Sequence, residues 1–92
     1  MHSMNDTIRL PAELGQAIQQ ARLKAGLSIS DLAEKAGKVR DVIYRIEAGK
    51  DTTLFSLFAV LSVLKLQIRL EAQGLPTLAQ VQARFGSQED DE

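Results

Sequence analysis

Apolar residues recur at helical spacing in the first stretch after the polar start of the chain. Pro11 suits the first turn of a helix, and Gly26 suits the position just after a helix ends. Between them the apolar positions fall on one helical face: Leu14, Ala17, Ile18, Ala21 and Ala25. The pattern predicts an amphipathic helix over residues 11–25.

A second helix is predicted between Ser28 and Gly37. Ser28 followed three residues later by Asp31 resembles a capping box, in which each side chain bonds the other residue's backbone N–H. The apolar residues at helical spacing would form its buried side: Ile29, Leu32, Ala33 and Ala36. Gly37 would end the helix, because glycine tolerates the left-handed backbone found there.

The third stretch, residues 39–48, has two chemically different faces. When each residue is turned by about 100° from the last, one side gathers the apolar residues Val39, Val42, Ile43 and Ile46. The opposite side, within about 140° by the same geometry, holds Arg40, Asp41, Tyr44, Arg45 and Ala48. We therefore predict an amphipathic helix with a chemically rich outer face, ended by Gly49.

From Leu54 to Leu64 the chain is apolar almost all round. One side would consist of Leu54, Leu57, Phe58 and Leu61, and another of Phe55, Ala59 and Val63. A helix that is apolar on two sides must be covered twice, and a chain of 92 residues has little else to cover it with. The second cover is therefore expected to come from another subunit.

Residues 66–72 begin with a strict alternation of apolar and polar positions, which predicts a short β-strand. A lone strand leaves its backbone groups unpaired, so its partner would be residues 7–10 or the same strand of a second copy. Together with the two-sided helix, this pattern predicts a homodimer. Its interface would comprise Phe55, Ala59, Val63, Leu66, Ile68 and Leu70.

Residues 73–92 are expected to form a partly disordered tail, because Gly74-Leu75-Pro76 breaks the chain. Within the tail, Leu78, Val81 and Phe85 have the spacing of a short amphipathic helix, which could dock on the body or contact a partner.

Charge is distributed unevenly along the chain. The net charge is −1, yet four of the twelve acids are residues 89–92, so residues 1–88 carry +3. Residues 35–50 contain five basic and two acidic side chains. We interpret this stretch as a local basic patch and the acidic tail as an aid to solubility.

Catalysis finds almost no support in the sequence. There is no cysteine, and the single histidine, His2, lies close to the N-terminus. The chain contains no nucleophile–base pair, metal-ligand cluster or phosphate-binding loop. It has neither an apolar run of about 18 residues nor a signal-peptide pattern. We therefore expect a cytoplasmic protein that is not an enzyme and has no cofactor and no metal.

Two short helices joined by a tight turn, the second with an exposed polar face, form the layout that places a helix in the DNA major groove. Arginine can bond guanine in a bidentate manner, aspartate can accept from cytosine, and tyrosine can pack against a thymine methyl. Lys35, Lys38 and Lys50 lie where phosphates would pass. A solvated basic face is also common, so charge alone does not establish DNA binding.

Specific spacings then match a known family. The matching positions are Leu14-Gly15-Gln16-Ala17-Ile18, Arg22, Gly26-Leu27-Ser28, Asp31-Leu32-Ala33, Gly37, Ile43, Ile46-Glu47 and Gly49. They resemble the XRE-type, lambda-repressor-like helix-turn-helix family over residues 12–65, which leaves residues 1–11 as an N-terminal segment. The resemblance implies an all-α, five-helix DNA-binding domain, usually dimeric, here followed by the β-strand that pairs across the dimer.

The resemblance also implies roles for particular residues. An arginine of the first helix commonly pairs with the glutamate that closes the third, which implies a structural ion pair between Arg22 and Glu47. Base contacts would come from Arg40, Asp41, Tyr44 and Arg45. Phosphate contacts would come from Ser28, Lys35, Lys38 and Lys50.

Three positions depart from the family pattern. Position 29 is usually glutamine, but Ile29 cannot reach a phosphate. Position 39 is usually Ser or Thr, but Val39 cannot cap a helix. Asp41 would meet a negatively charged duplex unless it reads a cytosine, complements the helix N-terminus or orients Arg40 or Arg45. These departures weaken the expected affinity for DNA but not the expected fold.

The segment Asp51-Thr52-Thr53-Leu54, the Phe-rich helix and the alternating strand look like the HipB antitoxin branch of the family. That likeness implies a homodimeric transcriptional repressor of its own operon, bound to a palindromic operator, that also holds a HipA-like kinase toxin inactive. Two alternatives remain: a stand-alone regulator without a toxin, and a protein-interaction module that has lost DNA binding.

Overall fold

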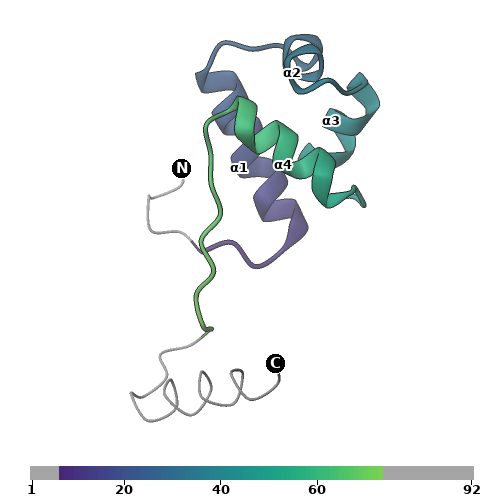
Figure 1. The fold of residues 1–92 in the computed structure, drawn as a ribbon. Helices are drawn as coiled ribbons and strands as arrows, with labels where there is room; N and C mark the ends of the chain where they lie inside the picture. The colour runs from purple at the N-terminus through teal and green to yellow at the C-terminus, as the bar shows by residue number, and fades with distance from the viewer. Residues whose placement is uncertain (1–6, 74–92) are drawn as a thin grey trace, which may run out of the picture.

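Four helices make up the part of the chain that the structure, a computed structural model, describes, namely residues 7–73 (Figure 1). They are α1 (Pro11–Lys24), α2 (Ile29–Ala36), α3 (Arg40–Glu47) and α4 (Leu54–Val63). The sequence pattern predicted all four almost to the residue. None of the helices among residues 7–73 is long and apolar enough to cross a membrane.

Local side-chain hydrogen bonds fix the starts of α1 and α4. Glu13 Oε1 accepts hydrogen bonds from the backbone N–H of Arg9 at 2.7 Å and of Leu10 at 3.2 Å. Thr53 is the N-cap of α4, and its Oγ1 accepts from the backbone N–H of Ser56 at 3.0 Å. These bonds satisfy backbone donors that a helix start leaves without an intrahelical partner.

Each of the four described helices is followed by a residue in the left-handed backbone conformation. After α1, α2 and α3 this residue is a glycine: Gly26 (φ 75°), Gly37 (φ 69°) and Gly49 (φ 77°). After α4 it is Lys65, with φ 59°. The Lys65 N–H donates to Ser62 O at 3.1 Å and the Leu66 N–H to Leu61 O at 2.9 Å, which closes the helix as a Schellman motif does.

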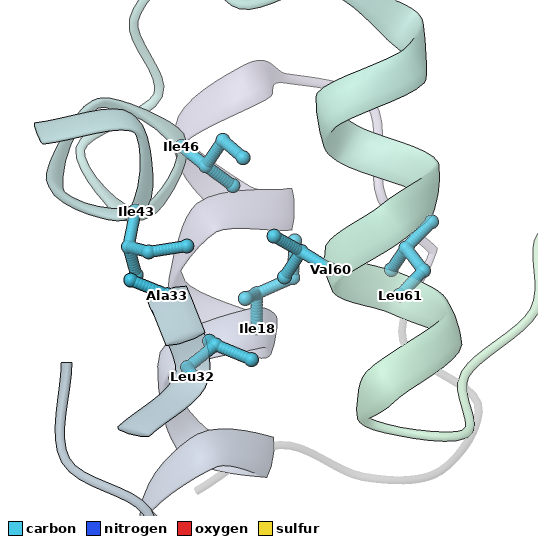
Figure 2. Packing of buried hydrophobic residues seen from close by; sticks show 7 residues of the cluster. All are labelled: Ile18, Leu32, Ala33, Ile43, Ile46, Val60 and Leu61. Atoms are coloured by element: carbon cyan, nitrogen blue, oxygen red, sulfur yellow. The ribbon is translucent and has the colours of Figure 1, made fainter. Parts of the chain in front are cut away.

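One apolar core joins all four helices. Figure 2 shows its buried side chains, which come from α1, α2, α3 and α4: Ile18, Leu32, Ala33, Ile43, Ile46, Val60 and Leu61. Several half-buried residues, among them Leu14, Ile29 and Val42, pack against this cluster. The predicted inner stripes of the first three helices therefore meet in one place, which fixes α3 on the body of the domain.

The prediction for the two sides of α4 is partly wrong. Leu61 is buried and Leu57 half-buried, but Leu54 and Phe58 are 71% and 54% exposed. Val60 belongs to the buried side instead. A helix that is apolar all round has no side that its sequence marks as inner, so the positions of its neighbours decide which residues are covered.

The residues of α4 that remain open define what we call the α4 apolar face, Leu54, Phe55 and Phe58. Phe55, predicted to lie in a dimer interface, is 87% exposed. Two other predicted interface residues behave differently: Ala59 is half-buried, and Val63 packs against the protomer's own core.

The expected five-helix domain is wrong for residues 12–65, where the structure has four helices. The chain turns at Lys65, and the alternating segment 66–73 that follows is not helical. This segment also forms no strand in the single chain, and neither do residues 7–10, so the option that these two segments pair is wrong. The interface residues Leu66, Ile68 and Leu70 are exposed there. Pairing of segment 66–72 across a dimer stays a prediction.

The remaining predictions concern residues 1–6 and 74–92, which lie outside the described residues. They include the partly disordered tail and the short helix with Leu78, Val81 and Phe85.

Candidate nucleic-acid interface

α3 is held against α1 by a close approach of the two backbones. A Cβ atom at Gly15 would lie 2.5 Å from the carbonyl oxygens of both Ile46 and Glu47, so only glycine leaves room for the last turn of α3. Gly15 is itself buried. This contact sets the distance between the end of α3 and the middle of α1.

A buried ion pair ties the same two helices together. Arg22 Nε donates to Glu47 Oε2 at 2.7 Å, and Arg22 Nη2 donates to Glu47 Oε1 at 3.2 Å. The two side chains are only 9% and 7% exposed. A third donor, Arg22 Nη1, reaches the carbonyl oxygen of Leu27 at 3.0 Å. The structure therefore brings together the two residues that the family resemblance pairs.

The hydrogen bond to Glu47 raises the pKa of Arg22, with burial acting in the opposite direction. Arg22 stays charged through the physiological range, because an arginine with a raised pKa does not lose its proton there. Its role in the domain is structural, since the Arg22–Glu47 pair connects α1, the end of the α1–α2 turn at Leu27 and the end of α3.

The start of α2 is closed by the predicted capping box. Ser28 Oγ accepts from the backbone N–H of Asp31 at 3.0 Å, and Asp31 Oδ2 accepts from the backbone N–H of Ser28 at 3.1 Å. This second hydrogen bond, from the Ser28 backbone, lowers the pKa of the Asp31 carboxyl. Ser28, a predicted phosphate contact, lies exposed at this helix start.

The outer face of α3 is open to solvent along its length. Arg40, Asp41, Tyr44 and Arg45 are all exposed, Tyr44 by 56%. On the other side of the helix, Ile43 and Ile46 are buried in the core. The structure thus places the four predicted base-contacting side chains on one exposed face of one helix.

Arg45 has a contact that the sequence pattern did not reveal. Its Nε donates to the backbone carbonyl of Asp51 at 3.1 Å, in the loop that leads to α4. This bond holds one side of the guanidinium and leaves its two terminal nitrogens for other partners. A hydrogen bond to a backbone carbonyl depends on loop geometry, so residue types and spacing carry no signal for it.

The start of α3 lacks a side-chain cap. Val39 is the N-cap residue, makes no capping hydrogen bond and is 67% exposed. It therefore does not share the buried side with Val42, Ile43 and Ile46, as the helical projection predicted. A residue at the N-cap position lies outside the regular helix, so the 100° rotation does not apply to it.

Basic residues lie before, within and after α3 in the sequence. Lys35 near the end of α2 and Lys50 after α3 are exposed, while Lys38 in the connecting turn is half-buried. Of the two acids among residues 35–50, Glu47 is paired with Arg22 inside the domain. Asp41 is thus the one exposed acid among five basic residues in that stretch. No group of acidic or histidine side chains among residues 7–73 could hold a metal ion.

Comparison with family models matches residues 18–70 to the family described as helix-turn-helix. Among solved structures, a HipA–HipB–O2–O3 complex contains a chain 31% identical to this one. The match has a TM-score of 0.69 and covers 75% of this chain and 99% of the other. A HipB–O4 20mer complex matches at 30% identity over the same shares, also with a TM-score of 0.69.

SinR, a master regulator of biofilm formation solved in complex with DNA, is 36% identical, with a TM-score of 0.54 over 59% of this chain and 89% of that chain. The controller protein C.AhdI from Aeromonas hydrophila, at 24% identity and a TM-score of 0.57, shares the fold over 61% of this chain and 86% of its own. A comparison with curated proteins found no significant match.

The family model covers more than half of the chain. The chain therefore belongs to the XRE-type helix-turn-helix family.

Proposed function

We propose that this chain is a sequence-specific DNA-binding transcriptional repressor that acts as a homodimer. The observation that carries the proposal is the exposed face of α3, where Arg40, Tyr44 and Arg45 stand side by side on a helix whose other side is buried. The DNA complexes of HipB and SinR among the similar structures support the same function.

In the proposed complex α3 enters the major groove. Arg40 and Arg45 bond guanines, Tyr44 packs against a base or bonds a phosphate, and Ser28, Lys35, Lys38 and Lys50 contact phosphates on either side. The Asp51 carbonyl steadies the guanidinium of Arg45 as it approaches a base edge. Asp41 either accepts from a cytosine or orients the neighbouring arginines.

The proposed dimer uses the surfaces that a single chain leaves open. Segment 66–72 pairs with its copy across a two-fold axis, which provides partners for backbone groups that no strand among residues 7–73 of the same chain bonds. The α4 apolar face lies beside it in sequence and adds Leu54 and Phe58 to the predicted contact with Phe55. Two α3 helices roughly 34 Å apart then read a palindromic operator.

We further propose that the repressor is the antitoxin of a HipA-like kinase toxin. Support comes from the similarity to the HipB chain of the HipA–HipB complex, which extends over 99% of that chain. The 36% identity to SinR favours a second candidate, a stand-alone regulator without a toxin. A HipA-like reading frame next to this gene favours the first candidate, and co-purification of the two products tests it.

DNA binding is tested by a mobility-shift titration on the upstream region of the protein's own gene, with the variant Arg40→Ala/Arg45→Ala. A bidentate arginine–guanine contact contributes about 1–3 kcal/mol of discrimination, so the double variant should bind at least roughly thirtyfold more weakly. The matched control is Arg9→Ala/Lys24→Ala, which removes the same charge from exposed positions on and before α1.

The control variant should bind within about threefold of the wild type, since screening weakens the effect of distant charges. Arg40→Ala alone is the cleaner single variant, because Arg45 also holds the loop at Asp51. Equal losses for both double variants would mean that charge, not readout by α3, governs binding. If no duplex binds in a salt-dependent manner, the third alternative, an interaction module without DNA binding, is correct.

A further inference from the structure

Val39 is an aliphatic side chain that lies open to solvent at the start of the exposed helix α3. Its exposed fraction is 67%, larger than the 56% of Tyr44, the other large apolar side chain exposed on this helix. The apolar residues that follow behave differently, since Ile43 is buried in the core and Val42 packs against it. A single exposed apolar residue is common on protein surfaces. The position of Val39 at a helix start, however, is not one that valine favours.

Val39 is the N-cap residue of α3, with φ −82° and ψ 159°, and its side chain makes no capping hydrogen bond. The N-caps of α2 and α4 are Ser28 and Thr53, whose side chains each accept from the backbone N–H three residues later. Valine ranks far below serine and threonine at this position, because it has no acceptor. Val39 thus serves neither the core nor the start of α3, and a residue that breaks a local rule in this way is a candidate for function.

Val39 directly precedes Arg40, the first residue of α3 and one of the proposed base contacts. In helix-turn-helix complexes the N-terminal residues of the recognition helix contact base edges. Consecutive Cα atoms are about 3.8 Å apart, and consecutive bases of one strand are about 3.4 Å apart along the duplex. Val39 and Arg40 can therefore reach neighbouring base pairs at the same time.

We infer that Val39 reads the C5-methyl group of a thymine in the base pair next to the guanine that Arg40 bonds. The inference rests on the proposed function, in which α3 lies in the major groove. The thymine methyl is the apolar group that bases show in this groove, and a valine side chain cannot hydrogen-bond the donors and acceptors of the others. Contact between the two groups removes the apolar surface of both from water.

The expected contribution of this contact follows from its size. Burying one methyl group changes an equilibrium constant about fourfold. A palindromic operator offers the contact twice, once to each protomer, so the two methyl groups together should change the affinity about fifteenfold. Val39 would thus refine a sequence preference that the two arginines establish.

Tyr44 is the other residue of α3 whose side chain could contact a thymine methyl. It is 56% exposed and follows Val39 by five residues, which corresponds to about 7.5 Å along the helix axis. Because base pairs are about 3.4 Å apart, the two side chains meet different base pairs. A methyl group read by Val39 can therefore be distinguished from one read by Tyr44.

The test replaces thymine by uracil, which pairs with adenine in the same way and lacks only the C5-methyl group. Operator duplexes from the upstream region of the protein's own gene carry uracil at one symmetric pair of thymine positions at a time, and mobility-shift titrations give each affinity. At one pair, the wild type should bind the uracil duplex about fifteenfold more weakly. Val39→Ser should bind the thymine and uracil duplexes equally at that pair. The matched control, Leu23→Ser, removes an aliphatic side chain that is 56% exposed on α1, and it should keep the full difference.

The variant Val39→Ser is chosen because it should fold at least as well as the wild type. Serine at position 39 can accept from the backbone N–H of Val42, as Ser28 Oγ accepts from the N–H of Asp31. Val39→Ser should therefore melt at a higher temperature while losing its dependence on the thymine methyl. A lower melting temperature with equally weakened binding to every duplex would overturn the inference, because Val39 would then support α3 itself.

Other outcomes would contradict the inference in distinguishable ways. If the wild type binds its operator specifically but no exchange of thymine for uracil weakens binding, the inference is wrong and the proposed function stands. If the methyl dependence persists in Val39→Ser and disappears in Tyr44→Ser, Tyr44 is the residue that reads the methyl group. If the wild type binds no duplex at all, the proposed function fails and the inference fails with it.

Discussion

At the scale of single residues, the Arg22–Glu47 pair is a contact whose loss is costly. Both side chains are almost fully buried, and Arg22 makes three hydrogen bonds, two to Glu47 and one to Leu27 O. The pair need not be more stabilising than two apolar residues would be. Removing one partner, however, leaves a buried charge without compensation, and that is strongly unfavourable.

We therefore expect Glu47→Ala to lower the free energy of unfolding by about 3–5 kcal/mol. This change in the free energy of unfolding is measured by urea denaturation, with circular dichroism as the signal. The control is Glu71→Ala, which breaks the exposed Arg69–Glu71 pair at 4.0 Å and should cost less than about 1 kcal/mol. If Glu47→Ala and Glu71→Ala lowered the free energy of unfolding equally, burial would not be the reason why the loss of Glu47 is costly.

Lys65 is a second residue with a defined energetic consequence. A non-glycine residue in the left-handed conformation costs roughly 1–2 kcal/mol, whereas glycine adopts it without steric cost but loses more entropy on folding. Lys65→Gly should therefore raise the free energy of unfolding by up to about 1 kcal/mol. Lys65→Ala retains a Cβ atom and should give no such gain, and thermal denaturation at one protomer concentration compares the three proteins.

At the scale of the elements, the helix ends explain why the helices could be predicted so closely. Pro11, Ser28, Thr53 and the glycines mark starts and ends through local backbone chemistry, which sequence spacing records directly. Which side of a helix packs against its neighbours is less evident from the sequence than where the helix begins and ends. For α4, the covered side depends on neighbours far away in sequence, so the sequence alone assigned Leu54 and Phe58 to the wrong side.

The capping box of α2 gives a prediction for the pH dependence of stability. The folded-state pKa of Asp31 is lower than its ordinary value of 3.8. The stabilisation is therefore fully present above that ordinary pKa and is lost as the pH falls through the folded-state pKa. Unfolding free energies of the wild type and Asp31→Asn should differ at neutral pH and converge as the pH falls through the folded-state pKa of Asp31. A difference independent of pH would exclude the carboxylate as its source.

At the scale of the whole molecule, the sequence predicted the all-α helix-turn-helix fold and the position of the exposed helix face, but not the number of helices or every contact in the site. The residues of α3 sort into buried and exposed sets by simple rotation, apart from Val39 at the helix start. The Arg22–Glu47 pair came from family resemblance, since no spacing rule links residues on α1 and α3. The Arg45–Asp51 bond could not be foreseen at all, because its acceptor is a backbone carbonyl.

At this scale we predict that the protein is a dimer in solution. Light scattering at tens of micromolar should give the mass of a dimer, and Ile68→Glu should give a monomer, because it places a charge in the proposed intermolecular sheet. The control is Leu23→Glu on α1, at a residue of similar exposure, 56% against 45% for Ile68. A wild-type monomer would contradict both the paired segment 66–72 and readout of two half-sites.

The close approach at Gly15 has a consequence for how sequence preference can change. The carbonyl oxygens of Ile46 and Glu47 lie where a methyl group at position 15 would be, so any other residue there must push the end of α3 away from α1. α3 would then meet a duplex at a different tilt, with all its exposed side chains unaltered. In the proposed complex, a substitution at position 15 would therefore change the preferred operator although Gly15 is buried, and a preference inferred from the exposed residues of α3 alone would be incomplete.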